Sequence, residues 1–173
     1  LDRVDDELVG PLPADEVIAG QWADQFVVDP IQAGAGTSHN MNLNEVIANR
    51  AAELLGGKRG DRGLVHPNDD VNKGQSTNNV FPSSIRVAAL DLSGGLLAAL
   101  KVLVSSLEKK ARQFKRIVKS GRTHLQDAVP VTLGQAFQAH ASALIKDMDR
   151  IRDTEKFLRA LGVGGNAVGT GLN

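Results

Sequence analysis

Three polar stretches carry the side chains that could do chemistry. The most concentrated is residues 120–130, which holds His124, one of only four histidines, directly after Thr123. Gly121 permits a tight turn and Pro130 prevents an ordinary helix, so a rigid scaffold could present this histidine on a loop. A polar helix connection with a surface histidine would explain the same residues, and this stretch alone does not decide between the two.

Two further stretches are rich in hydroxyl and amide groups. Residues 31–42 alternate glycines with small residues before Thr37 and Ser38, whose hydroxyls and neighbouring backbone N–H groups could face an anion. Residues 66–79 are almost wholly polar and use Asn, Gln, Ser and Thr in place of Lys and Glu. Such side chains bind a carboxylate or an amine specifically without a high density of charge. A flexible connector and a solvated loop are the plain alternatives.

Short elements are expected in the first half of the chain. Pro13 followed by acidic residues indicates a helix start, and residues 26–30 predict an extended segment because they are β-branched and end in proline. Residues 44–55 place apolar side chains on one helical face, with Asn42 or Asn44 as the cap.

Two long helices are expected in the second half. Apolar residues recur every three or four positions over about 82–114 and again over about 133–161. The stretch 120–130 therefore joins two apolar helices, and the glycine-rich end at 162–171 is expected to be a loop. The sequence predicts an all-α, mostly helical fold with a little extended structure near its N-terminal half.

The composition excludes several classes of protein. The 173 residues are 42% hydrophobic, 20 basic residues balance 20 acidic ones, and cysteine is absent. No basic field is available for nucleic acid, no thiolate metal site is possible, and apolar runs break short of the roughly 20 residues of a membrane span. We expect no metal, no cofactor and no membrane or nucleic-acid partner. A reducing, cytoplasmic location fits the lack of cysteine.

Neither end of the sequence resembles a natural terminus, so we expect these 173 residues to be a piece of a longer chain.

Taken together and in this order, the polar stretches resemble the aspartase/fumarase (class II fumarate lyase) superfamily. The segment 24–32 is more similar to aspartate ammonia-lyases than to fumarases. The matching motifs are 34–38 with 40–46, 66–69 with 71–78, 121–130, and the closing 167–173.

The resemblance implies a mostly helical fold built around a long helix bundle. It implies a homotetramer in which several subunits contribute to each active site. Residues 1–77 would be part of an N-terminal helical domain, and residues 78–173 would begin the central bundle, with its C-terminal part missing.

The reaction implied is the reversible elimination of ammonia from L-aspartate to give fumarate. A proton leaves the carbon next to the β-carboxylate, which becomes an aci-carboxylate, and donors are needed where that charge grows. The resemblance makes Thr123 and His124 the catalytic candidates. It implies that the reacting carboxylate is held by Thr37, Ser76 and Thr77. The other carboxylate and the amine would be held by Asn78, Thr123 and His124, and Ser38 is a further substrate-binding candidate.

A second dicarboxylate site is implied at His66, Asn68 and Asp69. Two positions depart from the family pattern, because Asn79 and Asp70 stand where an aspartate and a histidine are usual. The family's base, a serine on a mobile glycine–serine loop, lies downstream of the last residue here, so we expect this chain alone to be inactive. Two alternatives stay open: a fumarate hydratase that forms L-malate, and a non-catalytic helical module that binds dicarboxylates.

Overall fold

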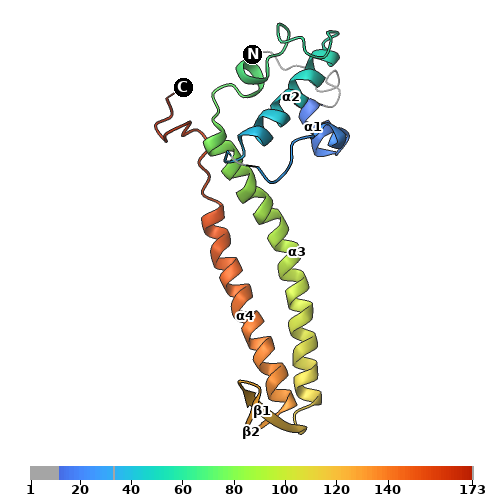
Figure 1. Ribbon diagram of the computed structural model, residues 1–173, viewed down its shortest axis with the longest axis vertical. Coiled ribbons are helices and arrows are strands. Elements are labelled where there is room, and N and C mark those ends of the chain that lie inside the picture. Colours follow the sequence, from blue (N-terminus) through green and yellow to red (C-terminus); the bar gives the residue numbers. More distant parts are fainter. Residues whose placement is uncertain (1–11, 33, 173) are drawn as a thin grey trace, which may run out of the picture. The chain divides into compact units, whose positions relative to one another are not determined.

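The computed structural model describes residues 12–32 and 34–172 (Figure 1). The chain divides into two compact units, and the division falls inside a helix. Unit 1 comprises Leu1–Ser84 and Leu161–Asn173, and unit 2 comprises Ile85–Ala160.

In unit 1, α1 (Pro13–Ile18) is followed by a 3₁₀ turn (Ala23–Gln25) and by α2 (Thr37–Leu54). A buried carboxylate fastens α1 to α2. Glu16 is only 4% exposed and accepts hydrogen bonds from Arg50 Nε at 2.7 Å, Arg50 Nη2 at 2.8 Å and Trp22 Nε1 at 2.7 Å. The arginine fork and the indole N–H compensate for removing the charge from water.

Helix α2 begins at Thr37, several residues before the predicted Asn42 or Asn44 cap. Its buried face is a stripe of small or amide side chains at four-residue spacing: Asn40, Asn44, Ala48 and Ala52. Apolar periodicity cannot detect a first turn whose buried side chain is an amide, which explains the late prediction. Gly36 precedes the helix with φ +84°, and a Cβ there would lie 2.3 Å from the Phe81 ring.

Helix α3 (Thr77–Gln113) also begins earlier than the predicted start at about residue 82. Ser76 Oγ accepts from the Asn78 N–H at 3.2 Å, and Asn79 Oδ1 accepts from the Ser76 N–H at 3.3 Å. This reciprocal cap starts the helix, and Pro82 lies inside its second turn instead of opening it. Residues 94 and 95 remain helical despite being glycines.

The connection in unit 2 is a β-hairpin, not an irregular loop. Strands β1 (Val118–Thr123) and β2 (Gln126–Thr132) pair antiparallel, with Thr123 opposite Gln126 and a register shift near Gly121. Within residues 12–32 and 34–172, the strands therefore lie here and not near the N-terminal half as predicted. Residues 26–30, expected to be extended, contain no strand.

Helix α4 (Leu133–Leu158) follows β2 directly, and Figure 1 shows it antiparallel to the unit 2 part of α3, with the hairpin joining them. A capping box starts α4: Gln135 N–H donates to Thr132 Oγ at 3.1 Å, and the Thr132 N–H donates to Gln135 Oε1 at 2.8 Å. Close packing beside the hairpin requires Gly134, because a Cβ there would lie 2.5 Å from the Ala111 carbonyl oxygen.

Both long helices leave apolar side chains uncovered. Leu92 is 71% exposed and Phe157 is 69% exposed, and a hollow of about 370 Å³ lies between α3 and α4. By length and composition alone α3 could cross a membrane, with 6% of its most apolar stretch buried within this chain. A core helix of a soluble bundle meets the same criterion, so this is weak evidence for a span.

Candidate functional site

The first turns of α2 and α3 meet in unit 1. Asn40 is 5% exposed, and its Nδ2 donates to Asn72 Oδ1 at 3.2 Å and to Thr77 Oγ1 at 3.1 Å. A second contact is the close approach of Gly36 to the Phe81 ring. The structure therefore brings the hydroxyl-bearing start of α2 next to the hydroxyl-bearing start of α3.

The predicted donors at the start of α2 are free to face a ligand. Thr37 and Ser38 are both exposed, and they follow three successive residues with positive φ, at 103°, 51° and 84° for positions 34 to 36. Ala35 is the costly member of that trio, because an L side chain rarely adopts this backbone conformation. Strain of this kind concentrates at ligand-binding loops.

A side cavity of about 390 Å³ adjoins this loop and is bordered by Ser38. His39 stacks on Phe81 with ring centroids 5.9 Å apart, and its Nε2 lies 3.3 Å from the Pro30 carbonyl oxygen. These contacts fasten Pro30 to the start of α2 and the start of α2 to that of α3.

At the start of α3, the predicted residues are differently placed. Ser76 and Thr77 are half-buried, and the Ser76 oxygen accepts the helix-capping hydrogen bond described above. Asn78 is exposed, and its Nδ2 donates to the Ala167 carbonyl oxygen at 3.1 Å. Part of the donor capacity predicted for Asn78 is thus used to hold the C-terminal loop.

The second-site candidates form the start of a short π-helical turn, Pro67–Val71. His66 Nδ1 accepts from the backbone N–H groups of Asn68 at 3.2 Å and Asp69 at 3.1 Å. Asp70 Oδ2 in turn accepts from the His66 N–H at 2.7 Å. The three predicted residues lie within four positions of each other and are held by this cap, and Asp70, which departs from the family pattern, takes part in it.

The catalytic candidates Thr123 and His124 lie in unit 2, in the hairpin. Both are exposed, and His124 with Leu125 forms the two-residue turn, with φ of 49° and 62°. Two successive left-handed residues define the I′ type of hairpin turn, which normally selects Asn-Gly. The predicted site residues therefore divide between the two units of this chain.

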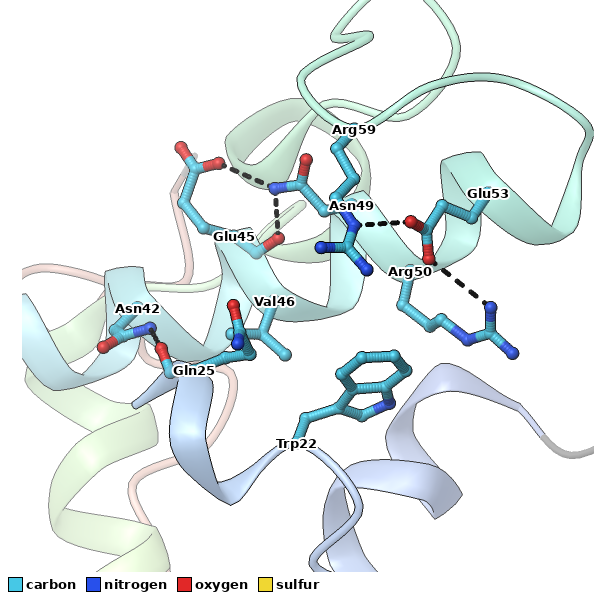
Figure 2. Close-up of a pocket in the computed structure, with 9 residues that line it drawn as sticks. All are labelled: Trp22, Gln25, Asn42, Glu45, Val46, Asn49, Arg50, Glu53 and Arg59. Carbon is cyan, nitrogen blue, oxygen red and sulfur yellow. Dashed lines mark hydrogen bonds and ion pairs between the residues drawn. The ribbon is translucent and has the colours of Figure 1, made fainter. Parts of the chain in front are cut away.

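Figure 2 shows the residues that line a further cavity, which lies between Trp22 and Gln25 on one side and α2 on the other. Its volume is about 300 Å³, and the sequence did not indicate it. Its charged groups pair with each other. Hydrogen bonds from Arg50, and then from Trp22, hold the pKa of Glu16 below its ordinary value, and Arg59 does the same for the pKa of Glu53. The Glu16–Arg50 pair ties α1 to α2, and the Glu53–Arg59 pair ties the loop after α2 to the same helix. The arginines that line this cavity are therefore already paired with carboxylates and are not free to bind an anionic ligand.

Two amides that join the helix starts, Asn40 and Asn72, were not among the predicted site residues, although both lie in the matching motifs. The available signal was the four-residue spacing of Asn40 and Asn44, which is a helical spacing of buried amides. Among residues 12–32 and 34–172, no three His, Asp or Glu side chains gather as metal ligands.

A family model described as lyase matches residues 13–173. The chain belongs to this lyase family, within the fumarase/aspartase superfamily. It is 52% identical over 160 residues to an aspartate ammonia-lyase of Bacillus sp, a match that covers 92% of this chain and 34% of the relative. It is 54% identical over 176 residues to a class II fumarate hydratase of Halobacterium salinarum, covering 100% of this chain and 37% of the relative.

The fold also matches a solved structure. The crystal structure of a fumarate lyase:delta crystallin from Brucella melitensis superposes with a TM-score of 0.82 at 50% identity, covering 93% of this chain and 35% of that one. The chain thus spans about a third of the length of the relatives it matches, and the mostly helical fold expected from the sequence is confirmed.

Proposed function

We propose that this chain is part of an ammonia-lyase that eliminates ammonia from L-aspartate to give fumarate. The observation that supports this most is the meeting of two helix N-termini, each carrying hydroxyl groups and neither carrying a lysine or arginine in its first turn. Helix N-termini and hydroxyls favour a carboxylate, and they favour it more as its negative charge grows.

The chemistry needs such donors. A base takes the proton from the carbon next to the β-carboxylate, and the electron pair moves into that carboxylate, which then carries two negative charges. The pair returns to form the carbon–carbon double bond as the carbon–nitrogen bond breaks and ammonia leaves with its bonding electrons. In this proposal Thr37, Ser38, Ser76 and Thr77 stabilise the doubly charged carboxylate.

The remaining functions come from elsewhere in the assembled protein. We propose that the base is a serine outside this chain, as the resemblance implies, so the 173 residues alone do not turn over. Thr123 and His124 belong to the other unit, and we propose that they bind the second carboxylate and the amine of a site shared between copies in a homotetramer. The exposed apolar faces of α3 and α4 suit such an assembly.

The test compares substrates and variants of the full-length protein that contains this chain. Fumarate formation is followed by ultraviolet absorbance with L-aspartate and L-malate in parallel, beside the 173-residue chain. Ser76→Ala is expected to lower kcat/KM at least ten-fold, as a lost donor to a growing charge does. Ser106→Ala is the matched control, because its hydroxyl donates to the Val102 carbonyl within α3. Turnover by the 173 residues alone would contradict the proposal.

A specific observation favours a second candidate, a fumarate hydratase. The relative from Halobacterium salinarum that carries this name aligns with the whole chain at 54% identity. The same donors would then stabilise the same doubly charged carboxylate, with water in place of ammonia. Activity on L-malate alone would select this candidate, and activity on neither substrate would favour a non-catalytic dicarboxylate-binding module.

A further inference from the structure

Asn40 determines whether the Thr77 hydroxyl donates or accepts the hydrogen bond between these two side chains. It is buried, and its Nδ2 group spends both of its hydrogens, one on Asn72 Oδ1 and one on Thr77 Oγ1. An amide can present either its oxygen or its NH₂ group to a neighbour, so the direction of these bonds needs a separate argument.

A backbone carbonyl supplies that argument. Asn72 Nδ2 lies 3.3 Å from the Gln75 carbonyl oxygen, which can only accept. Asn72 must therefore turn its Oδ1 the other way, toward Asn40. Because Asn72 presents an acceptor, Asn40 must present its NH₂ group, and that group also faces Thr77. The relay from Gln75 through Asn72 and Asn40 makes the Thr77 oxygen an acceptor.

We propose that Asn40 is a positioning residue that makes the Thr77 hydroxyl a dedicated donor to the substrate carboxylate; this rests on the function proposed above. Within the described part of the chain, the only hydrogen bond of Thr77 Oγ1 is the one it accepts from Asn40. Its own hydrogen is thus available, and Thr77 is half-buried at the helix start. A hydroxyl that accepts a hydrogen bond is also polarised into a stronger donor.

A purely structural role is the competing explanation, since Asn40 also joins α2 to α3. The two roles differ in a double-mutant cycle. If Asn40 acts through Thr77, the two side chains are coupled in ligand binding; if it only supports the fold, their effects on binding are independent.

The cycle uses the full-length protein, with fumarate as the probe and its Kd measured by calorimetry. Thr77→Val in the otherwise unchanged protein is expected to weaken fumarate binding on the order of ten- to a hundred-fold, the usual effect of losing a hydrogen bond to a charged group. Asn40→Asp replaces the donor by an acceptor, so the Thr77 hydroxyl turns inward. In the Asn40→Asp background, Thr77→Val is then expected to change Kd by less than about two-fold.

The cycle also removes the main confounding effect. The new charge of Asn40→Asp repels fumarate whether or not residue 77 has a hydroxyl, so repulsion cancels in the comparison. Asn42→Asp is the matched control, because it makes the same change on the same helix at a residue whose Nδ2 donates to the Gln25 carbonyl instead. There the Thr77→Val penalty is expected to equal that in the unchanged protein.

Three results would overturn the inference. One is an equal Thr77→Val penalty with and without Asn40→Asp, and another is an unchanged protein that does not bind fumarate. If circular dichroism shows that Asn40→Asp does not fold, Asn40→Leu replaces it. In the Asn40→Leu background, the effect of Thr77→Val on the Kd for fumarate should be at least three-fold smaller than in the unchanged protein. An equal effect in both backgrounds is the third overturning result. Turnover of L-aspartate is measured separately, so an inactive protein that binds fumarate with the expected coupling refutes the proposed function alone.

Discussion

The hairpin turn offers the sharpest prediction about the proposed catalytic histidine. His124 and Leu125 both have left-handed backbone conformations, with φ of 49° and 62°, at a turn that strongly prefers Asn followed by Gly. We therefore expect His124→Asn and Leu125→Gly each to stabilise the hairpin. Only His124→Asn removes an imidazole, so only this variant is expected to lose activity.

The magnitude follows from the backbone conformations. A left-handed residue other than glycine costs roughly 1–2 kcal/mol, and asparagine tolerates this conformation better than most residues. The Leu125 side chain is 92% exposed, so its removal forfeits almost no burial. A glycine at position 125 also lowers the free energy of unfolding by roughly 0.5–1 kcal/mol, because it increases the conformational freedom of the unfolded chain. The expected net gain is about 0.5–1 kcal/mol for Leu125→Gly and is smaller for His124→Asn, because histidine, like asparagine, is enriched in the left-handed region.

The assay has a stability arm and an activity arm. Urea unfolding, followed by circular dichroism at 222 nm, measures the free energy of unfolding of each variant. Fumarate formation by the full-length protein measures kcat/KM, which should fall for His124→Asn and stay within two-fold for Leu125→Gly. A His124→Asn variant that is less stable, or that keeps full activity, would refute the reasoning that function holds a histidine in an unfavourable conformation.

Three further predictions concern packing, pH and capping. Gly134→Ala should destabilise the chain by about 1–3 kcal/mol in urea unfolding, because the new Cβ would meet backbone atoms of Ala111 and Lys115. Gly95→Ala should stabilise it by about 0.8–1 kcal/mol, because a Cβ at this helical position has no other atom within 4 Å. The pKa of Glu16 is lowered by its arginine partner, so its stabilising effect is present above the ordinary glutamate pKa and is lost as pH falls through the lowered value. Fluorescence of the single tryptophan should report that acid transition and should show none in Glu16→Gln. Asn79→Ala should cost about 1 kcal/mol through the lost cap, whereas Asn79→Asp should keep the acceptor.

The sequence located the helices better than their starts. The start of α4 at Leu133 was predicted correctly, because apolar spacing resumes immediately after the β-branched residues that follow Pro130. The starts of α2 and α3 were predicted several residues late. Both first turns are polar, and the buried side chains in them are amides, Asn40 in α2 and Asn79 in α3. The partners of Asn40 are 32 and 37 residues away, and apolar periodicity detects no buried amide, even one with a local partner such as Asn79.

The hairpin could not have been predicted from turn chemistry. Neither strand shows the alternation of apolar and polar residues of a half-buried sheet, since most of its residues are exposed. The turn residues His124 and Leu125 lack the usual Asn-Gly signature. The start of α4 is held against the end of α3 by backbone hydrogen bonds, from the Leu133 N–H to the Ile117 carbonyl oxygen at 2.7 Å and from the Gly134 N–H to the Phe114 carbonyl oxygen at 3.1 Å. These contacts bring the two ends of residues 118–132 together, and a local sequence pattern does not contain them.

Three deviations from local rules lie at the proposed site, while others, such as the left-handed Asn166 and the buried Glu16, lie outside it. Ala35 and His124 occupy left-handed conformations, and Asn40 is an amide buried where an apolar residue would be cheaper. Each lies in, or directly beside, a segment that could hold a carboxylate. Along α2 the buried stripe continues from Asn40 with a second amide, Asn44, and then with the small residues Ala48 and Ala52. Unfavourable local choices persist when the rest of the structure supports them and function rewards them. The positive φ values of Gly56 and Gly60, in the surface turns, carry no such argument, because glycine adopts them without strain. At Ala35 and His124 the backbone conformation therefore supports the proposed site, in addition to the sequence motifs that first indicated it.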